Sequence, residues 1–387
     1  MAAMEFVIRG ILVGDTVASD ITIRDGIVAR ISRAGRGACN AGSHTSIIGP
    51  TLFDIQVNGY GGIDLQGLNV LPEDVAAIDA KLQKIGVSHW IPTLITASFE
   101  NIEHGCATIA AARKDRALAK RIPGVHIEGP YISPDDGPRG AHDRRHVRKP
   151  DLREFDCWYR AADEAVTYLT IAPEIDGAIP FIKEMAKRGI VVSLGHHNAT
   201  PDQIARAVDA GARMCTHLGN GMAAHIPRHN NPLWPQLAED RLYASLIPDL
   251  EHLPPPILKT IARVKGPLRT MLTSDAVHIA GLKPGKYDLA GMPVELKKSG
   301  RICLIGTELL AGSATSLLQG VFNAAAHTDL TLAEAFASAS RVPAQLFGLK
   351  ERFQRPRKGS PASLIVAGVT GTKVAIKSVW VDGTRVV

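Results

Sequence analysis

The sequence predicts a (β/α)8 TIM-like barrel with a small discontinuous β-sandwich domain built from both ends of the chain. Three observations predict this fold. Eight short β-rich apolar runs alternate with helix-like stretches through the middle of the 387 residues. Both ends contain only short strands that alternate apolar and polar residues. No Gly-rich nucleotide-binding motif follows any central run, so a doubly wound open sheet, the competing arrangement, has no motif to support it.

The two ends of the chain are expected to pair into one small sheet layer. The first segment, FVIRGILVG followed by SDITIRDGIVARISR, alternates around a turn at Asp25 and Gly26. The last segment, from SLIVAGV to KSVWVDGTRVV, has the same character and a tight turn at Asp382 and Gly383. The predicted domains are the N-terminal part of the small β domain at 1–50, the barrel at 51–350, and the C-terminal part of the small β domain at 351–387.

The eight central runs have the length and composition of buried parallel strands. Stretches with helical periodicity, such as EDVAAIDAKLQKIG and PDQIARAVDAGA, lie between most of them. The runs are LFDIQV (52–57), SHWIPTLI (88–95), GVHIE (124–128), VTYLTIAPE (166–174), IVVSLGH (190–196), RMCTHL (213–218), YASLIPD (243–249) and RTMLTSD (269–275).

The composition excludes several classes of protein. With 45% hydrophobic and 21% charged residues, the chain is neither disordered, collagen-like nor a coiled coil. The net charge of 44 − 38 = +6 is too small to indicate nucleic acid as a partner. The five cysteines are dispersed without a CxxC pair, so no disulfide framework is expected. No apolar stretch reaches the roughly 20 residues that cross a bilayer, and no signal-peptide pattern opens the chain. We therefore expect a cytoplasmic protein with neither a nucleic-acid nor a membrane partner.

Polar side chains end several of the predicted strands. In a barrel these strand ends meet at one face, where active sites lie. A single strand-end histidine or carboxylate is more often a helix cap or a satisfied buried group, but six on separate strands are hard to explain as independent caps. The residues are Glu128, Glu174, His196, His217, Asp249 and Asp275.

Four of these residues have the chemistry of a metal-dependent hydrolase. Glu128, His196 and His217 would give a divalent ion three ligands and leave a fourth position for water. Asp275, as an unligated carboxylate, could take the proton of that water and return it to a leaving group. The pattern therefore predicts metal-assisted hydrolysis. One divalent ion is expected, zinc by preference, although iron, manganese and cobalt accept the same ligands.

Several longer segments together resemble one known family. They are TLFDIQVNGYGGID, GVHIEGPYISP followed by GAHD, SLGHHNATPDQIARAVDAGARMCTHLGNGM, TSDAVHIAGLKPGKYDLAGM and LAGSATSLLQG. In this order and at this spacing they resemble the N-acetylglucosamine-6-phosphate deacetylase family of the amidohydrolase superfamily. The resemblance covers the chain from about Gly49 to Ala325. It implies an enzyme that hydrolyses the acetamide of a small-molecule amino sugar to the free amine and acetate.

The resemblance also implies roles for individual residues. Glu128, His196 and His217 are implied to bind one catalytic metal. Asp275 is implied to be the general base and then the general acid, and His142, in GAHD, matches a histidine near the acyl oxygen. The residues implied to bind substrate are Asn220, Gly221, Arg228 and His252, with Arg228 reaching the sugar phosphate across a homodimer interface.

Two departures from the family pattern bear on the site. Gln56 and Asn58 replace the HxH motif that many amidohydrolases carry on strand one, which favours a single metal. The loop MAAHIPRHNNPLWPQ keeps Arg228 but not the residues usual around it, so the identity of the sugar stays open. The alternatives are a deacetylase of an unphosphorylated or differently configured N-acetyl amino sugar, an amidohydrolase of cyclic amides or N-acyl amino acids, and a non-catalytic amidohydrolase-like scaffold.

Overall fold

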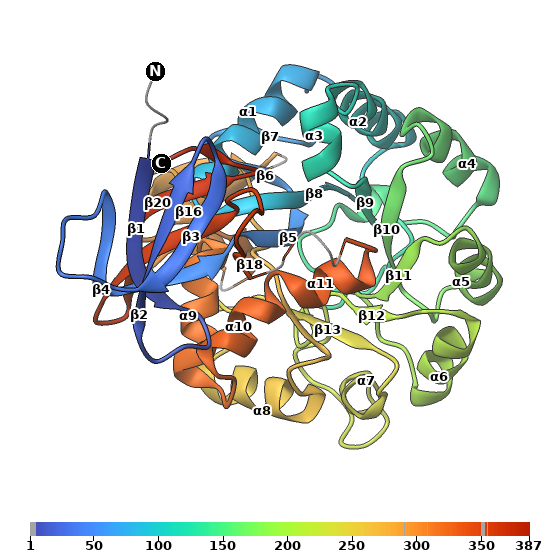
Figure 1. The fold of residues 1–387 in the computed structure, drawn as a ribbon. Helices are drawn as coiled ribbons and strands as arrows, with labels where there is room; N and C mark the ends of the chain where they lie inside the picture. The colour runs from blue at the N-terminus through green and yellow to red at the C-terminus, as the bar shows by residue number, and fades with distance from the viewer. Residues whose placement is uncertain (1–4, 290, 308, 350–352, 354) are drawn as a thin grey trace.

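Eight parallel strands form a barrel at the centre of the molecule (Figure 1). The computed structural model describes residues 5–289, 291–307, 309–349, 353 and 355–387. Each barrel strand pairs in parallel with the next in chain order, which confirms the predicted barrel. The strands are β5 (Leu52–Val57), β8 (Val87–Ile95), β9 (Val125–Glu128), β10 (Val166–Ile171), β11 (Val191–Leu194), β12 (Met214–Cys215), β13 (Tyr243–Leu246) and β14 (Thr270–Leu272).

Hydrogen bonds between the first and last strands close the barrel. Val57 of β5 forms a parallel bridge with Ala276, just beyond β14. The buried carboxylate of Asp54 accepts hydrogen bonds from Thr273 Oγ1 at 2.7 Å and from Ser274 N at 3.0 Å. This seam holds the C-terminal end of β5 beside the loop that follows β14.

Helices cover the outside of the barrel, as the alternating pattern predicted (Figure 1). The helix of PDQIARAVDAGA begins where Thr200 accepts a hydrogen bond from Gln203 N and ends at Gly211, whose φ of 118° is left-handed. Its buried side chains Ile204 and Val208 join the main hydrophobic core. No helix among the described residues is long and apolar enough to span a bilayer. The helices are α1 (Pro72–Lys84), α2 (Phe99–Ala112), α3 (Arg116–Arg121), α4 (Leu152–Ala161), α5 (Ala178–Lys187), α6 (Pro201–Ala210), α7 (Leu233–Ala238), α8 (Pro255–Lys265), α9 (Leu317–His327), α10 (Leu332–Ser338) and α11 (Arg341–Leu346), with a 3-10 turn at Arg144–His146.

A four-stranded antiparallel sheet follows the last barrel strand and was not expected from the sequence. Its segment alternates apolar and polar residues around left-handed turns at Gly291 and Gly300. Buried Val294, Leu296 and Ile302 form its core. We call it the inserted sheet; its strands are β15 (Gly285–Leu289), β16 (Met292–Leu296), β17 (Arg301–Leu304) and β18 (Leu310–Ser313). A short hairpin after β5 adds β6 (Gly59–Tyr60) and β7 (Ile63–Asp64).

Both ends of the chain form a seven-stranded sheet beside the barrel (Figure 1). Its strands, in sheet order, are β21 (Thr384–Arg385), β20 (Lys373–Val381), β19 (Leu364–Thr370), β4 (Ala41–Pro50), β1 (Glu5–Leu12), β2 (Ala18–Arg24) and β3 (Ile27–Arg33). Val28 exchanges backbone hydrogen bonds with Gly359 and Ser360, which curls the edge strand β3 toward the segment before β19. The sheet has its own core, including Ile8 and Leu364. The predicted fold class is confirmed, whereas the boundaries at 50 and 351 stay a prediction.

The barrel strands are shorter than predicted, which changes where the polar residues lie. β10 ends three residues before Glu174. His196, His217 and Asp275 adopt φ values of 52°, 30° and 51°, outside the range of β-strands. Of the six predicted strand-end residues, Glu128 lies on its strand, and the other five, including Asp249 after β13, lie in the segments that follow theirs.

Candidate metal centre and active site

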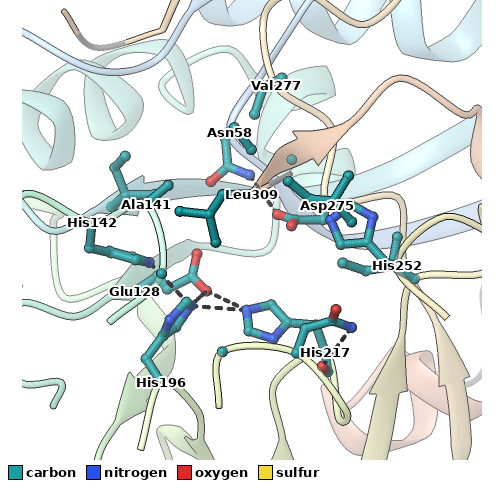
Figure 2. Close-up of a pocket in the computed structure, with 18 of the residues that line it drawn as sticks. Asn58, Glu128, Ala141, His142, His196, His217, His252, Asp275, Val277 and Leu309 are labelled. Carbon is teal, nitrogen blue, oxygen red and sulfur yellow. Dashed lines mark hydrogen bonds and ion pairs between the residues drawn. The ribbon is translucent and has the colours of Figure 1, made fainter. Parts of the chain in front are cut away.

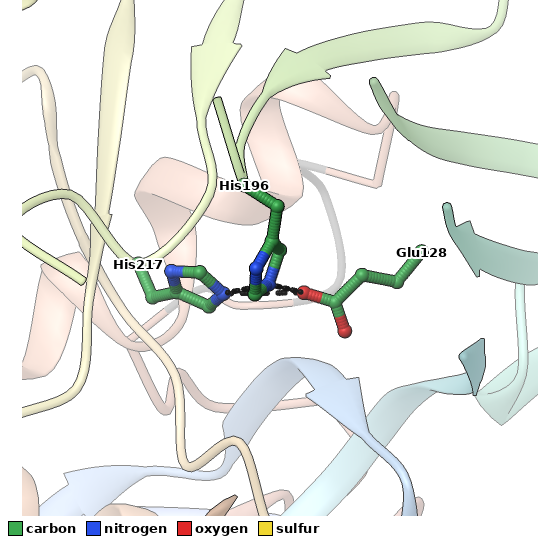
Figure 3. Close-up of side chains that lie close together, drawn as sticks. All are labelled: Glu128, His196 and His217. Atoms are coloured by element: carbon green, nitrogen blue, oxygen red, sulfur yellow. Dashed lines mark hydrogen bonds and ion pairs between the residues drawn. The ribbon is translucent and has the colours of Figure 1, made fainter. Parts of the chain in front are cut away.

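The three predicted ligand side chains converge at the C-terminal face of the barrel (Figure 3). Glu128 ends β9, while His196 and His217 follow β11 and β12. Glu128 Oε1 lies 3.2 Å from Nε2 of each histidine, and the two Nε2 atoms are 3.0 Å apart. Ligands at about 2.0–2.1 Å from a tetrahedral ion are about 3.3 Å from one another. These three atoms therefore have nearly the spacing that one ion requires.

A backbone carbonyl orients the His196 imidazole, and a close glycine packs against both imidazoles. His196 Nδ1 donates to the carbonyl oxygen of Pro138 at 2.9 Å, which leaves the Nε2 lone pair for a cation. Gly221 packs against both rings. A Cβ atom at Gly221 would lie 3.0 Å from His196 Nδ1 and 3.1 Å from His217 Cε1. A larger residue at Gly221 would therefore displace the ligands.

The electrostatics of the cluster favour a bound cation. Burial raises the pKa of Glu128, but hydrogen bonds with His196 and His217 outweigh it and hold the pKa well below its usual range. The cluster thus places an ionised carboxylate against two imidazole nitrogens, all of them buried. A buried charge of this kind needs a compensating positive charge close by. The residues fit a divalent metal ion.

Asp275 stands beside the cluster (Figure 2) and is held by two amide side chains, Gln56 and Asn58. Gln56 Nε2 and Asn58 Nδ2 donate to the same carboxylate oxygen, Oδ1, at 3.0 and 2.8 Å. Gln56 Nε2 also donates to Glu128 Oε2 at 3.1 Å, which links the two carboxylates. No described residue donates to Asp275 Oδ2, so this oxygen can exchange a proton. Burial and the charge of Glu128 raise the pKa of Asp275 to about 7.

His142 flanks the cluster on the side opposite Asp275 (Figure 2). Its Nε2 lies 3.1 Å from His196 Nε2, and its Nδ1 lies 2.8 Å from Thr96 Oγ1. Burial, with a smaller contribution from His196, lowers the pKa of His142 to about 3. His142 is therefore neutral at physiological pH, and it can donate an N–H to an anionic oxygen without repelling a cation.

His252 forms a buried pair with Asp249 at another wall. Its Nδ1 donates to Asp249 Oδ2 at 2.7 Å, and its backbone N–H donates to Asp249 Oδ1 at 2.8 Å. Burial lowers the pKa of His252, but the hydrogen bond and charge of Asp249 outweigh it, and the pKa is raised. The imidazolium form of His252 can donate its remaining N–H to a substrate oxygen.

The cluster lines a cavity of about 500 Å³ (Figure 2). The predicted substrate residues Asn220, Gly221 and His252 also line it, as do His142 and Asp275. Among the described lining residues there is no lysine or arginine. Positive charge inside the cavity therefore comes from imidazoles and from any bound ion. The inserted sheet and the turn before β18 supply an apolar wall of Leu289, Met292, Leu309, Leu310 and Ala311.

Two residues singled out in the sequence lie outside this cavity. Arg228 is exposed in the loop before α7, where its carbonyl accepts a hydrogen bond from Trp234 Nε1 at 2.9 Å. Glu174 is half-buried, and its Oε1 accepts a hydrogen bond from Asn198 N at 2.7 Å. Burial raises the pKa of Glu174 to about 7. The structure therefore brings neither residue to the metal cluster.

Sequence reasoning missed several residues that shape the site. Gln56 and Asn58 were interpreted only as replacements for metal ligands, whereas they hold Asp275. Their spacing was a usable signal, because residues two apart on a strand face the same way. Thr96, which contacts His142, carried no such signal. Neither did Leu309, since an apolar residue in an alternating β segment is usually part of a core.

Comparison with known proteins identifies the family. Residues 47–386 match the Amidohydrolase family. The chain therefore belongs to the amidohydrolase family, a class of metal-dependent hydrolases. The buried carboxylate and imidazole cluster of this chain agrees with that membership.

The particular relatives are deacetylases of amino sugar phosphates. The chain is 32% identical to N-acetylglucosamine-6-phosphate deacetylase of Danio rerio over 352 residues, which cover 86% of this chain and 84% of the relative. It is 30% identical to N-acetylgalactosamine-6-phosphate deacetylase of Shewanella sp. (strain ANA-3) over 354 residues, which cover 88% of this chain and 84% of the relative. A mutant N-acetyl-D-glucosamine-6-phosphate deacetylase from Mycobacterium smegmatis, solved with N-acetyl-D-glucosamine-6-phosphate, has a TM-score of 0.86 at 27% identity, covering 99% of both chains. The resemblance found in the sequence motifs is confirmed.

Proposed function

We propose that this protein hydrolyses the acetamide of N-acetylglucosamine 6-phosphate to glucosamine 6-phosphate and acetate. The observation that carries the proposal is the convergence of Glu128, His196 and His217 beside Asp275, whose Oδ1 is held and whose Oδ2 is available. Similarity to N-acetylglucosamine-6-phosphate deacetylases supports the substrate.

Asp275 moves one proton in the proposed mechanism. Its Oδ2 accepts the proton of the attacking water while Gln56 and Asn58 hold Oδ1. Asp275 then passes that proton to the amide nitrogen, so the C–N bond breaks with release of a neutral amine and of acetic acid, which ionises to acetate by losing its remaining proton to solvent. Glu128, His196 and His217 would hold a divalent ion, which would supply Lewis acidity for activating the water and polarising the amide carbonyl.

Other residues of the cavity orient the substrate. His142, neutral because of its burial, donates a hydrogen bond to the oxygen that gains negative charge. His252 and Asn220 offer donors to sugar oxygens, and Gly221 lets the backbone approach the substrate beside the two imidazoles.

The phosphate is proposed to bind Arg228 of a second copy of the chain in a homodimer. Two observations support this arrangement: Arg228 is exposed, and no lysine or arginine is found among the described residues that line the cavity. N-Acetylgalactosamine 6-phosphate is the second candidate substrate, favoured by the similarity to the Shewanella enzyme. An unphosphorylated N-acetyl amino sugar is the third, since the cavity itself lacks a fixed cationic side chain.

Zinc is the proposed ion, and the cytoplasm is the proposed location. Two imidazoles and one carboxylate with an open fourth position are typical of catalytic zinc, although iron, manganese and cobalt also accept them. All five cysteines are free thiols, and Cys106, Cys215 and Cys303 are buried. Free thiols in this number are usual in a reducing compartment.

An acetate-release assay tests the proposed function. The zinc-loaded protein is given N-acetylglucosamine and N-acetylgalactosamine, each with and without the 6-phosphate, and kcat/KM is measured for all four sugars. The expected order places N-acetylglucosamine 6-phosphate first. Release of acetate from none of the four, by protein whose zinc content is confirmed, would refute the proposal. If the protein prefers another of the four sugars, that sugar becomes the proposed substrate.

A further inference from the structure

Asn58 has an unused hydrogen-bond acceptor in the cavity. The residue follows β5, lines the cavity and is only 6% exposed. Its Nδ2 donates to Asp275 Oδ1 at 2.8 Å. Its Oδ1 is buried and accepts no hydrogen bond from any described residue. In Figure 2 this oxygen points away from Asp275, into the space bounded by Ala141 and Leu309.

An unpartnered acceptor that faces the cavity indicates a bound group that donates a hydrogen bond there. Buried oxygen atoms in native proteins are nearly always paired, because an unpaired one loses its interaction with water without replacement. Asn58 cannot turn to satisfy Oδ1 without giving up its hydrogen bond to Asp275. The partner of Oδ1 must therefore enter the cavity from outside.

The proposed substrate carries a suitable donor next to the bond that breaks. The acetamide nitrogen has one N–H, and the same nitrogen must later receive the proton from Asp275. Both ends of the Asn58 carboxamide belong to one planar group, so Oδ1 keeps a fixed position relative to the Asp275 carboxylate. A nitrogen whose N–H is bound at Oδ1 therefore lies on the cavity side of the same carboxamide that donates to Asp275 at its other end.

We propose that Asn58 Oδ1 accepts the N–H of the scissile amide and holds its nitrogen against Asp275. The N–H stays on Asn58 while the carbonyl carbon becomes tetrahedral. The lone pair that then forms on nitrogen faces Asp275 Oδ2. Asn58 thereby selects an amide over an ester, which has no N–H at this position. The inference rests on the proposed function, because it needs an amide substrate.

Gln56 provides a matched control for this role. Its side chain also donates to Asp275 Oδ1, at 3.0 Å, but it is fully buried and does not line the cavity. Replacing Gln56 therefore disturbs Asp275, and with it Glu128, without removing a contact to substrate. Replacing Asn58 disturbs Asp275 and also removes the proposed contact to substrate.

The test compares an amide and an ester that differ in one group. N-Acetylglucosamine 6-phosphate and 2-O-acetylglucose 6-phosphate are given to the wild-type protein, Asn58→Ala and Gln56→Ala, and kcat and KM are measured separately. Asn58→Ala is expected to lower kcat/KM about tenfold more for the amide than for the ester, the effect of one lost hydrogen bond. Gln56→Ala is expected to lower both alike. If the ester turns over slowly, its inhibition constant against the amide reaction gives the same comparison.

A second variant separates the acceptor from the donor. Asn58→Asp keeps an oxygen at the acceptor position but loses the N–H to Asp275, so overall activity falls while the preference for the amide is retained. Thermal unfolding and zinc content identify any variant that fails to fold, and Asn58→Ser then replaces Asn58→Ala. Equal losses for amide and ester in the Asn58 variants would overturn the inference. If the wild-type protein hydrolyses none of the acetamido sugars, the proposed function fails instead.

Discussion

The catalytic cavity has two regions that are built by different means. The metal end is made of strand ends and the turns after them, and its polar atoms lie within about 3 Å of one another. Three of its residues adopt left-handed backbone, which costs about 1–3 kcal/mol each. The other wall comes from loops and the inserted sheet, is mostly apolar, and includes Leu309 at 54% exposure.

This difference separates chemistry from recognition. The hydrogen bonds of the closed barrel fix where each strand ends. The turns that follow can therefore hold residues with left-handed backbone. Loops and the inserted sheet can change without disturbing the barrel. We therefore expect substitutions at the metal end to abolish hydrolysis for every sugar, and substitutions at the other wall to change which sugar is preferred.

The largest effect is expected from Glu128→Gln. Loss of the only carboxylate in the cluster removes the charge that balances a divalent ion, so zinc content should fall and kcat/KM should drop about 10³-fold or more. Glu174→Gln is the matched control, because Glu174 is a half-buried carboxylate at this face but lies away from the cluster. Metal analysis and acetate release measure both effects. Full zinc content in Glu128→Gln would contradict the assignment of the ligands.

Asp275→Asn is expected to lose about 10²–10⁴-fold in kcat while retaining zinc. In the wild-type protein Asp275 acts as a base only when ionised, so activity falls as pH decreases through its pKa. Burial and the charge of Glu128 raise that pKa to about 7, and a bound cation lowers it again. The acidic limb of a kcat/KM profile should therefore have its midpoint at or below about pH 7. An Asp275→Asn variant with wild-type activity would exclude this residue as the base.

A smaller and selective effect is expected from Arg228→Ala. The KM for N-acetylglucosamine 6-phosphate should rise about tenfold, because a charge-assisted hydrogen bond is lost. Activity on N-acetylglucosamine should not change. Arg153→Ala, at another exposed arginine, controls for the loss of surface charge. The same increase in KM for both sugars would show that Arg228 does not bind the phosphate.

The smallest effect is one on stability alone, at Glu174. Its folded-state pKa of about 7 lies above the ordinary 4.5, so protonated Glu174 stabilises the fold. That contribution is complete below pH 4.5 and is lost as pH rises through 7. Between pH 5 and pH 8 the wild-type protein should lose about 2–3 kcal/mol of unfolding free energy that Glu174→Gln does not lose. Denaturant unfolding at both pH values measures this difference, with exposed Glu73→Gln as control. Parallel pH dependence in wild type and Glu174→Gln would rule out the raised pKa.

The barrel and its metal cluster could be predicted from the sequence for physical reasons. Buried parallel strands leave apolar runs, and a histidine or glutamate at the end of such a run stands out, as with Glu128 and His217. The strand lengths were harder to predict, because residue types alone do not indicate the left-handed backbone at His217 and Asp275. The resemblance supplied Arg228, an exposed residue outside the cavity, whose proposed contact with the phosphate requires a second copy of the chain. Leu309 could not be predicted, since an apolar side chain carries the same pattern in a core and in a cavity wall.

The pairing of β4 with β19 has a consequence for synthesis of the chain. β4 ends at Pro50 and its partner begins at Leu364, with the whole barrel between them. While the ribosome makes the barrel, one side of β4 keeps its amide and carbonyl groups exposed. A bare strand edge is a template for adhesion to other chains. The nascent polypeptide therefore exposes an unpaired, aggregation-prone strand edge for most of its translation, until β19 is made and pairs with β4.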